Sequence, residues 1–167
     1  ARACASIGIN CTVINHSNAE PFFIREDFIK KWKVLADVFR PYGLTTYISV
    51  NFACPRKPSR IPYGRKVWGG IGHLDTADPL NQEVIEWWKA KVAEIYAAVP
   101  DLGGFLVKAN SEEMGGPQDY GRTHVEGANM LADILKPYGG VLLWRTFNKD
   151  RNTDEDKAKR SYKEFIE

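Results

Sequence analysis

Residues 40–50 read RPYGLTTYISV and join the end of a predicted helix directly to a predicted strand. Pro41 cannot continue a helical hydrogen-bond ladder, and Gly43 tolerates the positive φ with which many helices end. Residues 136–144 read KPYGGVLLW and repeat this junction before a second apolar strand. This internal sequence repeat predicts a chain built from repeated helix-to-strand units.

Four predicted strands alternate with three predicted helices along the chain. The strands are Thr12–Ile14, Leu44–Val50, Phe105–Val107 and Val141–Trp144. The first helix has one apolar face formed by Phe28, Trp32, Leu35 and Phe39, and the second has one formed by Val84, Trp88, Val92, Ile95 and Val99.

Start signals precede the second and third helices. Asp78-Pro79 is typical of a helix start, and Thr123 and Glu126 have the T-x-x-E spacing of a capping box. We therefore expect the second helix to begin near Pro79 and the third at Thr123.

Strands that alternate with helices have to pair in parallel, and continuous apolar strands predict burial on both faces of the sheet. No Gly-x-Gly-x-x-Gly follows a strand, which disfavours a dinucleotide-binding sheet and leaves a barrel. A complete (β/α)8 TIM barrel needs roughly 250 residues. We therefore predict that residues 1–167 form a single α/β segment, about the first half of a barrel domain (strands 2 to 5), truncated at both termini. The isolated half should be marginally stable or self-associating.

Composition excludes several classes of function. The 23 basic and 21 acidic residues give a net charge of +2, so the electrostatic field of the chain is too weak to favour binding to nucleic acid or to a membrane surface. Cys4, Cys11 and Cys54 are an odd number without C-x-x-C spacing, which favours reduced thiols over disulfides or a zinc site. No apolar run is long enough to span a membrane. We expect neither a metal nor a cofactor.

Polar residues follow every predicted strand. The strand ends carry Asn15, Asn51, Lys108 with Asn110 and Glu112, and Trp144 with Arg145. Chemistry in barrel enzymes takes place at the carboxyl ends of the strands, so these residues are the candidate site.

Glu112 lies in a Gly- and Pro-rich loop just beyond the third strand. A sheltered carboxyl group at such a position can act as the general acid that protonates a glycosidic oxygen. The structural alternative is an ordinary surface glutamate. Spacing alone leaves Glu112 and its neighbour Glu113 equally eligible.

Lys108 and Arg145 each directly follow an apolar strand and should reach the same rim. Two cations at one rim suggest an anionic ligand, since Arg can hold a carboxylate through two parallel hydrogen bonds. Neutralisation of carboxylates at the rim is the structural alternative. The basic stretch Arg56–His73 is interpreted as a long loop, either ordinary or a lid.

The segment from Gly103 to Glu112, GGFLVKANSE, followed by GPQDYGRTH at 116–124, resembles glycoside hydrolase family 67, the α-glucuronidases. The similarity extends to further stretches across nearly the whole chain: residues 5–10, 12–15, 36–43, 76–80 and 127–133.

The resemblance implies removal of (4-O-methyl-)D-glucuronic acid, α-1,2-linked to xylose in xylan oligosaccharides, by an inverting mechanism without metal or cofactor. It selects Glu112 as general acid, and Lys108 and Arg145 as residues that hold the uronic acid. The family's general base would lie beyond Glu167, so we expect the isolated chain to be inactive. For a bacterial parent enzyme we expect the cytoplasm, with a homodimer as one candidate assembly.

Two other functions are compatible with the same residues. A retaining barrel glycosidase would use Glu112 as acid/base together with a carboxylate nucleophile. A non-catalytic protein could bind uronate or xylan fragments through the cations and aromatic rings alone.

Overall fold

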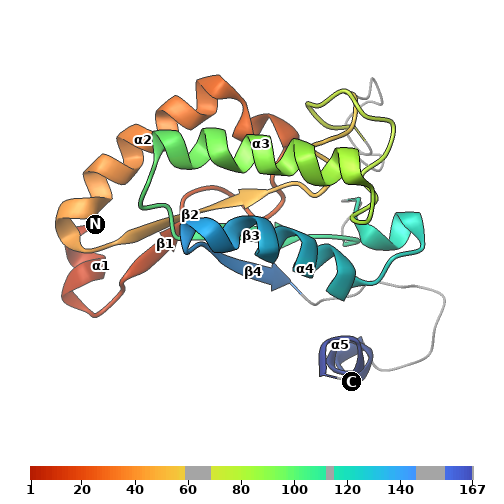
Figure 1. Cartoon of the computed structure of the whole chain (residues 1–167). Coiled ribbons are helices and arrows are strands. Elements are labelled where there is room, and N and C mark those ends of the chain that lie inside the picture. The colour runs from red at the N-terminus through yellow and green to blue at the C-terminus, as the bar shows by residue number, and fades with distance from the viewer. Residues whose placement is uncertain (59–68, 112–114, 146–156, 167) are drawn as a thin grey trace.

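The computed structural model describes residues 1–58, 69–111, 115–145 and 157–166 (Figure 1). Its strands are β1 (Cys11–Val13), β2 (Thr45–Val50), β3 (Gly104–Lys108) and β4 (Val141–Arg145). Its α-helices are α1 (Arg2–Ser6), α2 (Glu26–Phe39), α3 (Gln82–Ala98), α4 (His124–Leu135) and α5 (Lys157–Ile166). Four 3-10 turns, η1 to η4, occupy Pro21–Ile24, Arg40–Tyr42, Pro117–Tyr120 and Lys136–Tyr138.

The four strands form one parallel sheet in the order β1-β2-β3-β4. The predicted α/β alternation and the four predicted strands are therefore confirmed to within one or two residues at each end. Sequential order means that each strand pairs with the next one along the chain. The sheet contains no reversal of strand order of the kind that marks a doubly wound fold.

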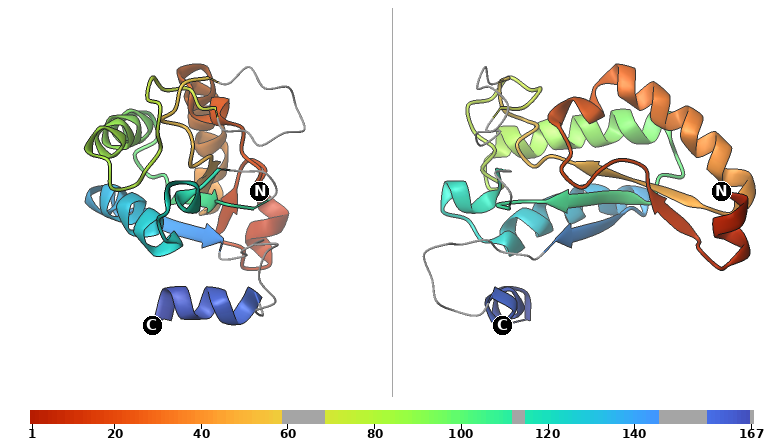
Figure 2. Two further views of the ribbon diagram at one scale, coloured as in Figure 1. Left: turned by 90° about the vertical axis from the view of Figure 1, so that its right-hand side faces the viewer. Right: turned by 180° about the vertical axis from the view of Figure 1, so that it is seen from behind.

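Helices α2, α3 and α4 all lie along the same face of this sheet (Figures 1 and 2). The buried core fills the space between them, with Ile48 and Val50 from β2 and Phe105 and Val107 from β3 meeting the helices. Each helix therefore covers the sheet from the same side, as successive crossover connections of one hand require.

The buried face of α3 is the predicted one, because Val84, Trp88, Val92 and Ile95 are all buried. In α2 the prediction is only partly right. Trp32 is buried as expected, but its buried neighbours are Ile29 and Ala36, whereas Phe28 and Leu35 lie at the border of the core. The buried positions Ile29 and Ala36 each lie one residue after the predicted ones, and the Trp32 indole donates a hydrogen bond of 2.7 Å to the carbonyl of Phe23 in η1.

The two repeated junctions adopt the same conformation. In each, an α-helix tightens into a 3-10 turn, η2 or η4, and a glycine with φ of 68° turns the chain into the next strand. These glycines are Gly43 and Gly139, as predicted. The left-handed backbone at both positions disfavours any other residue.

One predicted helix start is confirmed and the other is wrong. Thr123 accepts a hydrogen bond from the Glu126 amide at 3.1 Å, and the Glu126 carboxylate accepts one from the Thr123 amide at 2.7 Å. Helix α3, however, begins at Gln82 and not at Pro79. Asn81 caps it by accepting from the Glu83 amide at 2.8 Å, while the Asp78 carboxylate is committed to other partners.

The second face of the sheet is only partly covered. The side chains on this second face, called the inner face below, alternate along the strands with the core residues. Two of them on β4 are exposed to solvent, Val141 by 49% and Leu143 by 38%. The prediction that every strand is buried on both faces is therefore wrong for β4 and for β1, neither of which contains a fully buried residue. Strand β4 is an edge of the sheet that the described residues form. Strand β1 forms the other edge.

All three cysteines are free thiols, with Cys54 buried. Among the described residues, no helix has the length and apolarity needed to cross a membrane. The predicted long loop is closed at its base, where the Lys57 amide donates to the carbonyl of Leu74 at 2.8 Å. Residues 59–68 of that loop lie outside the described residues.

Candidate functional site

Lys108 and Arg145 come from neighbouring strands and are directly opposite one another in the β3–β4 register. Parallel register partners point to the same face, and Lys108 alternates with the core residue Val107. Both cations therefore emerge on the inner face, at the carboxyl end of the sheet. The structure brings together the two residues that the sequence assigned to an anionic ligand.

Lys108 is nevertheless only 1% exposed. Its ammonium group donates a hydrogen bond to the side-chain carbonyl of Asn18, which belongs to the loop after β1. An ammonium group offers donors only, so the amide oxygen of Asn18 has to face the lysine. Asn18 thus contacts the cation, and the sequence could not predict this contact because the two residues are 90 positions apart.

Asn15 and Asn51, two further predicted site residues, hold this loop against the sheet. Asn15 bonds both backbone groups of Ser49, accepting from its amide at 2.7 Å and donating to its carbonyl at 2.9 Å. Asn51 is buried, donates to the carbonyl of Ala19 at 3.2 Å and accepts from the Ala53 amide at 2.8 Å. Their amides extend the pairing of β1 and β2 beyond the ends of the strands.

Asn110 shapes the loop that follows β3. Its φ is 49°, a left-handed backbone that asparagine tolerates better than most residues. Its side-chain carbonyl accepts from the Gln118 amide at 3.1 Å. Gly116 packs so closely that a Cβ there would lie 2.2 Å from the Asn110 side-chain oxygen. Glu112, the predicted acid, and Glu113 lie outside the described residues.

Trp144 points towards the helix-covered face and not towards the inner rim. Its indole nitrogen donates to Nδ1 of His124 at 3.2 Å, and its ring makes edge-to-face contacts with Phe52 and His124. Because Nδ1 accepts this bond, the imidazole proton resides on Nε2 in the neutral ring. These contacts place Trp144 behind the predicted cation pair, where it fixes the end of β4.

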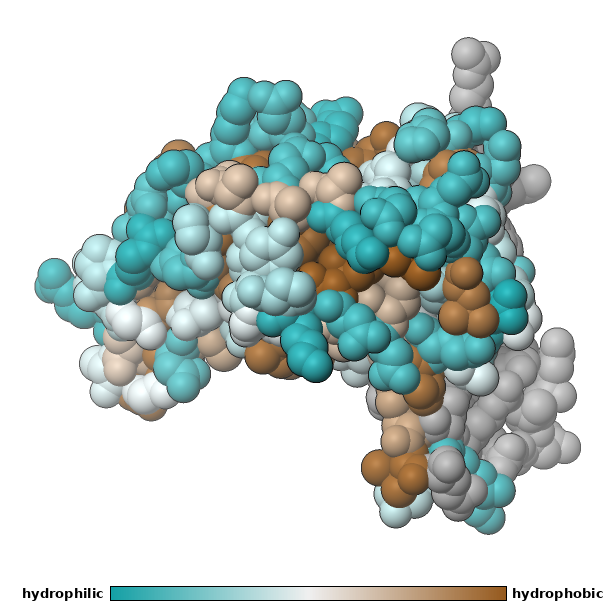
Figure 3. Space-filling view, in the orientation of Figure 1, coloured by the Kyte–Doolittle hydropathy of each residue, from teal (hydrophilic) through white to brown (hydrophobic). Residues whose placement is uncertain are grey.

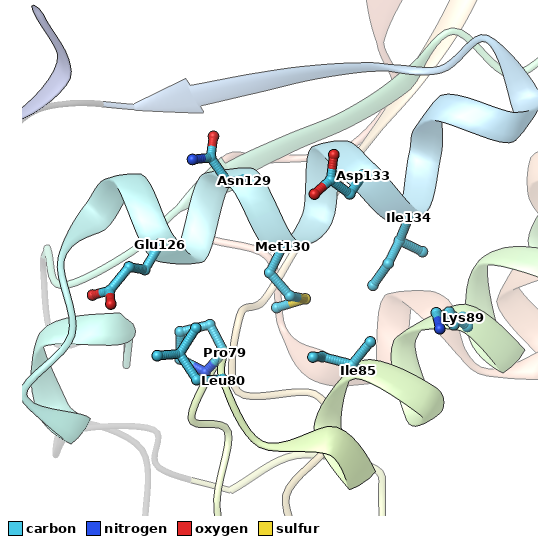
Figure 4. Close-up of a pocket in the computed structure, with 9 residues that line it drawn as sticks. All are labelled: Pro79, Leu80, Ile85, Lys89, Glu126, Asn129, Met130, Asp133 and Ile134. Atoms are coloured by element: carbon cyan, nitrogen blue, oxygen red, sulfur yellow. The ribbon is translucent and has the colours of Figure 1, made fainter.

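An apolar groove of about 400 Å3 lies elsewhere, between α3 and α4. Figure 3 shows hydrophobic atoms exposed in a hollow between hydrophilic side chains, and in Figure 4 Met130 and Ile134 point from α4 towards Ile85. This groove is on the helix-covered face and contains none of the strand-end candidates. Within the described ranges, no cluster of three or more His, Cys, Asp or Glu residues could hold a metal ion.

Comparison with known proteins gives the family. The sequence pattern described as the glycosyl hydrolase family 67 middle domain matches residues 1–167. The chain belongs to glycosyl hydrolase family 67.

Relatives of this family 67 chain carry names that state an activity. It is 43% identical over 155 residues to the alpha-glucuronidase of Hypocrea jecorina and 42% identical over 156 residues to a probable alpha-glucuronidase A of Aspergillus clavatus. Each match covers 93% of this chain. A probable alpha-glucuronidase A of Aspergillus niger is 41% identical over 99% of the chain. The chain spans about 17% of the length of the first two relatives and 19% of the third.

A further ion pair of the family 67 chain joins the loops after β2 and β3. Arg122 donates to the carboxylate of Asp78 from Nε at 3.0 Å and from Nη2 at 3.0 Å. The hydrogen bond from Arg122 lowers the pKa of Asp78 below its usual value. The sequence suggested Asp78 only as a helix start, since no local spacing signals a contact 44 positions away.

Proposed function

We propose that this chain is part of the catalytic domain of an inverting α-glucuronidase, which removes (4-O-methyl-)D-glucuronic acid α-1,2-linked to xylose in xylan oligosaccharides. The observation that carries the proposal is the pairing of Lys108 and Arg145 at one rim. A carboxylate on the sugar is the ligand group that such a pair of cations would recognise. Family membership and the names of the relatives support the same activity.

The proposed architecture is a (β/α)8 TIM barrel, of which residues 1–167 form a single segment of about half, roughly strands 2 to 5. Sequential strand order and helices on one face support a barrel over a doubly wound sheet, which reverses its order and carries helices on both faces. The partly exposed inner face of β4 has the apolar character of a surface that further strands would cover.

Glu112 is the proposed general acid. In the sequence it follows Lys108, the last residue of β3, by four positions and Asn110 by two. In an inverting mechanism the acid protonates the leaving oxygen while a second carboxylate activates water on the opposite face of the sugar. We place that second carboxylate on a later strand of the longer enzyme, and the proposed reaction needs no cofactor.

The cations and amides of the rim have separate proposed roles. Arg145 binds the uronic carboxylate directly, because its guanidinium is delivered to the inner face by the end of β4. Buried Lys108 contributes its charge to the rim and orients the Asn18 amide through a hydrogen bond. Asn110 holds the acid loop in shape, while Asn15, Asn51 and Trp144 support the rim from behind.

Substitution of Glu112 tests this proposal in the intact enzyme. Glu112→Gln should lower kcat on an aldouronic acid by about 100-fold or more, because an amide cannot deliver the proton, while affinity for the substrate is largely retained. The matched control is Glu113→Gln, one position along the chain, which should leave kcat within about threefold of the original enzyme. Near-normal turnover in Glu112→Gln, or loss only in Glu113→Gln, would reject the assignment.

A further inference from the structure

Two loops at the carboxyl end of the sheet are joined by the Asp78–Arg122 ion pair. Asp78 belongs to the connection between β2 and α3, and Arg122 to the connection between β3 and α4. Two guanidinium nitrogens of Arg122 each lie 3.0 Å from a different oxygen of the Asp78 carboxylate. These two parallel hydrogen bonds, called the fork below, fix the relative orientation of the two loops as well as the distance between them.

Both partners are held firmly by their own segments. The Asp78 carboxylate also accepts from the Leu80 amide at 3.0 Å, and its own amide donates to the Thr76 hydroxyl at 3.0 Å. The Arg122 amide donates to the carbonyl of Pro117 at 3.2 Å. The next residue, Thr123, caps α4. The ion pair therefore connects two ordered turns and does not bridge two loose side chains.

Tyr120 anchors the same turn from the side of the core. Its ring is partly buried and packs against the hydrophobic core. Burial raises the pKa of Tyr120, as expected for a phenol that is partly removed from water. The turn that carries Arg122 is therefore held by core packing as well as by the ion pair.

These contacts fix the far end of the loop that carries Glu112 in the sequence. The near end is fixed by β3 and by the bond between the Asn110 side chain and the Gln118 amide. We propose that Asp78 and Arg122 are positioning residues for proton donation, holding the loop after β3 so that the acid reaches the glycosidic oxygen. This inference rests on the function proposed above and adds a specific determinant to it.

A comparison of two substrates of the intact enzyme separates positioning from general stability. Departure of xylose from an aldouronic acid needs a proton from the enzyme, whereas fluoride departs from α-D-glucuronyl fluoride with little need of one. We expect Asp78→Asn and Arg122→Met to lower kcat on the aldouronic acid by about 10- to 100-fold and kcat on the fluoride by less than about threefold. KM should change little on either substrate.

The matched control is the Arg40–Asp101 pair at the opposite end of the sheet. Arg40 binds Asp101 in the same forked way, with Nε at 2.6 Å and Nη2 at 2.8 Å from its two oxygens. Arg40→Met and Asp101→Asn should therefore remove an equivalent ion pair without changing the ratio of the two rates. Arg122→Lys, which keeps the charge but not the fork, should give an intermediate ratio.

Three outcomes decide the matter. The Asp78–Arg122 pair would be purely structural if Arg122→Met lowered kcat equally on both substrates. The same conclusion would follow if the ratio of the two rates changed no more in Arg122→Met than in Arg40→Met. If Glu112→Gln, measured alongside, slows the aldouronic acid selectively while Arg122→Met does not, only the positioning inference fails. If Glu112→Gln does not discriminate between the substrates, the proposed function fails and the inference fails with it. Should Asp78→Asn and Arg122→Met fold poorly, the charge-exchanged double variant Asp78→Arg/Arg122→Asp should restore the ratio of the two rates to that of the original enzyme, and a ratio that stays altered in a folded double variant would contradict the inference.

Discussion

Two cationic side chains, Lys108 and Arg145, leave neighbouring strands at the same end and on the same face of the sheet. Placing two positive charges so close costs free energy unless anionic or polar groups compensate them. Asn18 supplies part of this compensation by accepting from the Lys108 ammonium. In the proposed function, a uronic carboxylate would bind at this rim as well.

Asp78 should make the stability of the chain sensitive to acid. Its pKa is lowered in the folded chain, chiefly by the hydrogen bond from Arg122. The stabilisation is therefore complete above the ordinary aspartate pKa of about 3.9, and it is lost as the pH falls through the lowered value. The unfolding midpoint of the original chain should exceed that of Asp78→Asn at neutral pH, and the difference should shrink below about pH 4.

The control for this titration is Asp75→Asn. The Asp75 carboxylate lies 2.9 Å from the ammonium of Lys57, but its side chain is 87% exposed, against 22% for Asp78. An exposed pair of this kind contributes little, so its removal should shift the midpoint only slightly at any pH. An equal, pH-independent loss in both variants would refute the role given to the Asp78 pair.

At the residue scale, the sequence was informative where side chains follow strands and uninformative where distant loops meet. Lys108 and Arg145 could be assigned to one rim because alternation and parallel pairing determine where a residue after a strand points. Asn18 and the Asp78–Arg122 pair could not be predicted. Their contacts depend on how separate loops fold over the sheet, which no local spacing encodes.

At the level of the elements, the repeated junctions dominate the architecture. Gly43 and Gly139 have the same φ, and each lets a helix turn directly into the next strand. These junctions and the Thr123 cap were predictable because their signals are local backbone chemistry. The start of α3 was not, since Asp78 and Asn81 are both competent caps, and it is Asn81 that accepts from the amides of the first helical turn.

The capping box of α4 should contribute measurably to stability. Thr123→Ala removes the acceptor for the Glu126 amide and should lower the free energy of unfolding by about 1 kcal/mol in urea titration. Thr123→Ser keeps the hydroxyl and should restore most of the loss. Equal destabilisation by both substitutions would mean that the threonine methyl group, and not the cap, is responsible.

The chain as a whole presents an open sheet. Core residues fill the space under α2, α3 and α4, whereas Val141 and Leu143 on the inner face are exposed. Strands β1 and β4 are the edges of the sheet that the described residues form (Figure 2). The parallel order was predictable from alternation, whereas the expected burial of β4 required neighbours that the described residues do not supply. Exposed apolar strand surfaces of this kind promote association.

The isolated chain should therefore self-associate through the inner face. Size-exclusion chromatography should show a mass that increases with concentration, and Leu143→Lys should shift the equilibrium towards monomer. Val34→Lys is the matched control, because Val34 is exposed on α2, away from the sheet. A stable monomer at every concentration, melting cooperatively, would contradict the half-barrel interpretation.

The central claim, an inverting α-glucuronidase with Glu112 as acid, is tested most directly by proton NMR of the intact enzyme acting on an aldouronic acid. The substrate is α-linked, so inversion predicts that the β anomer of free glucuronic acid appears first and then mutarotates. First appearance of the α anomer would establish retention and contradict the proposed mechanism. Binding of the substrate without release of glucuronic acid would contradict the enzymatic function itself.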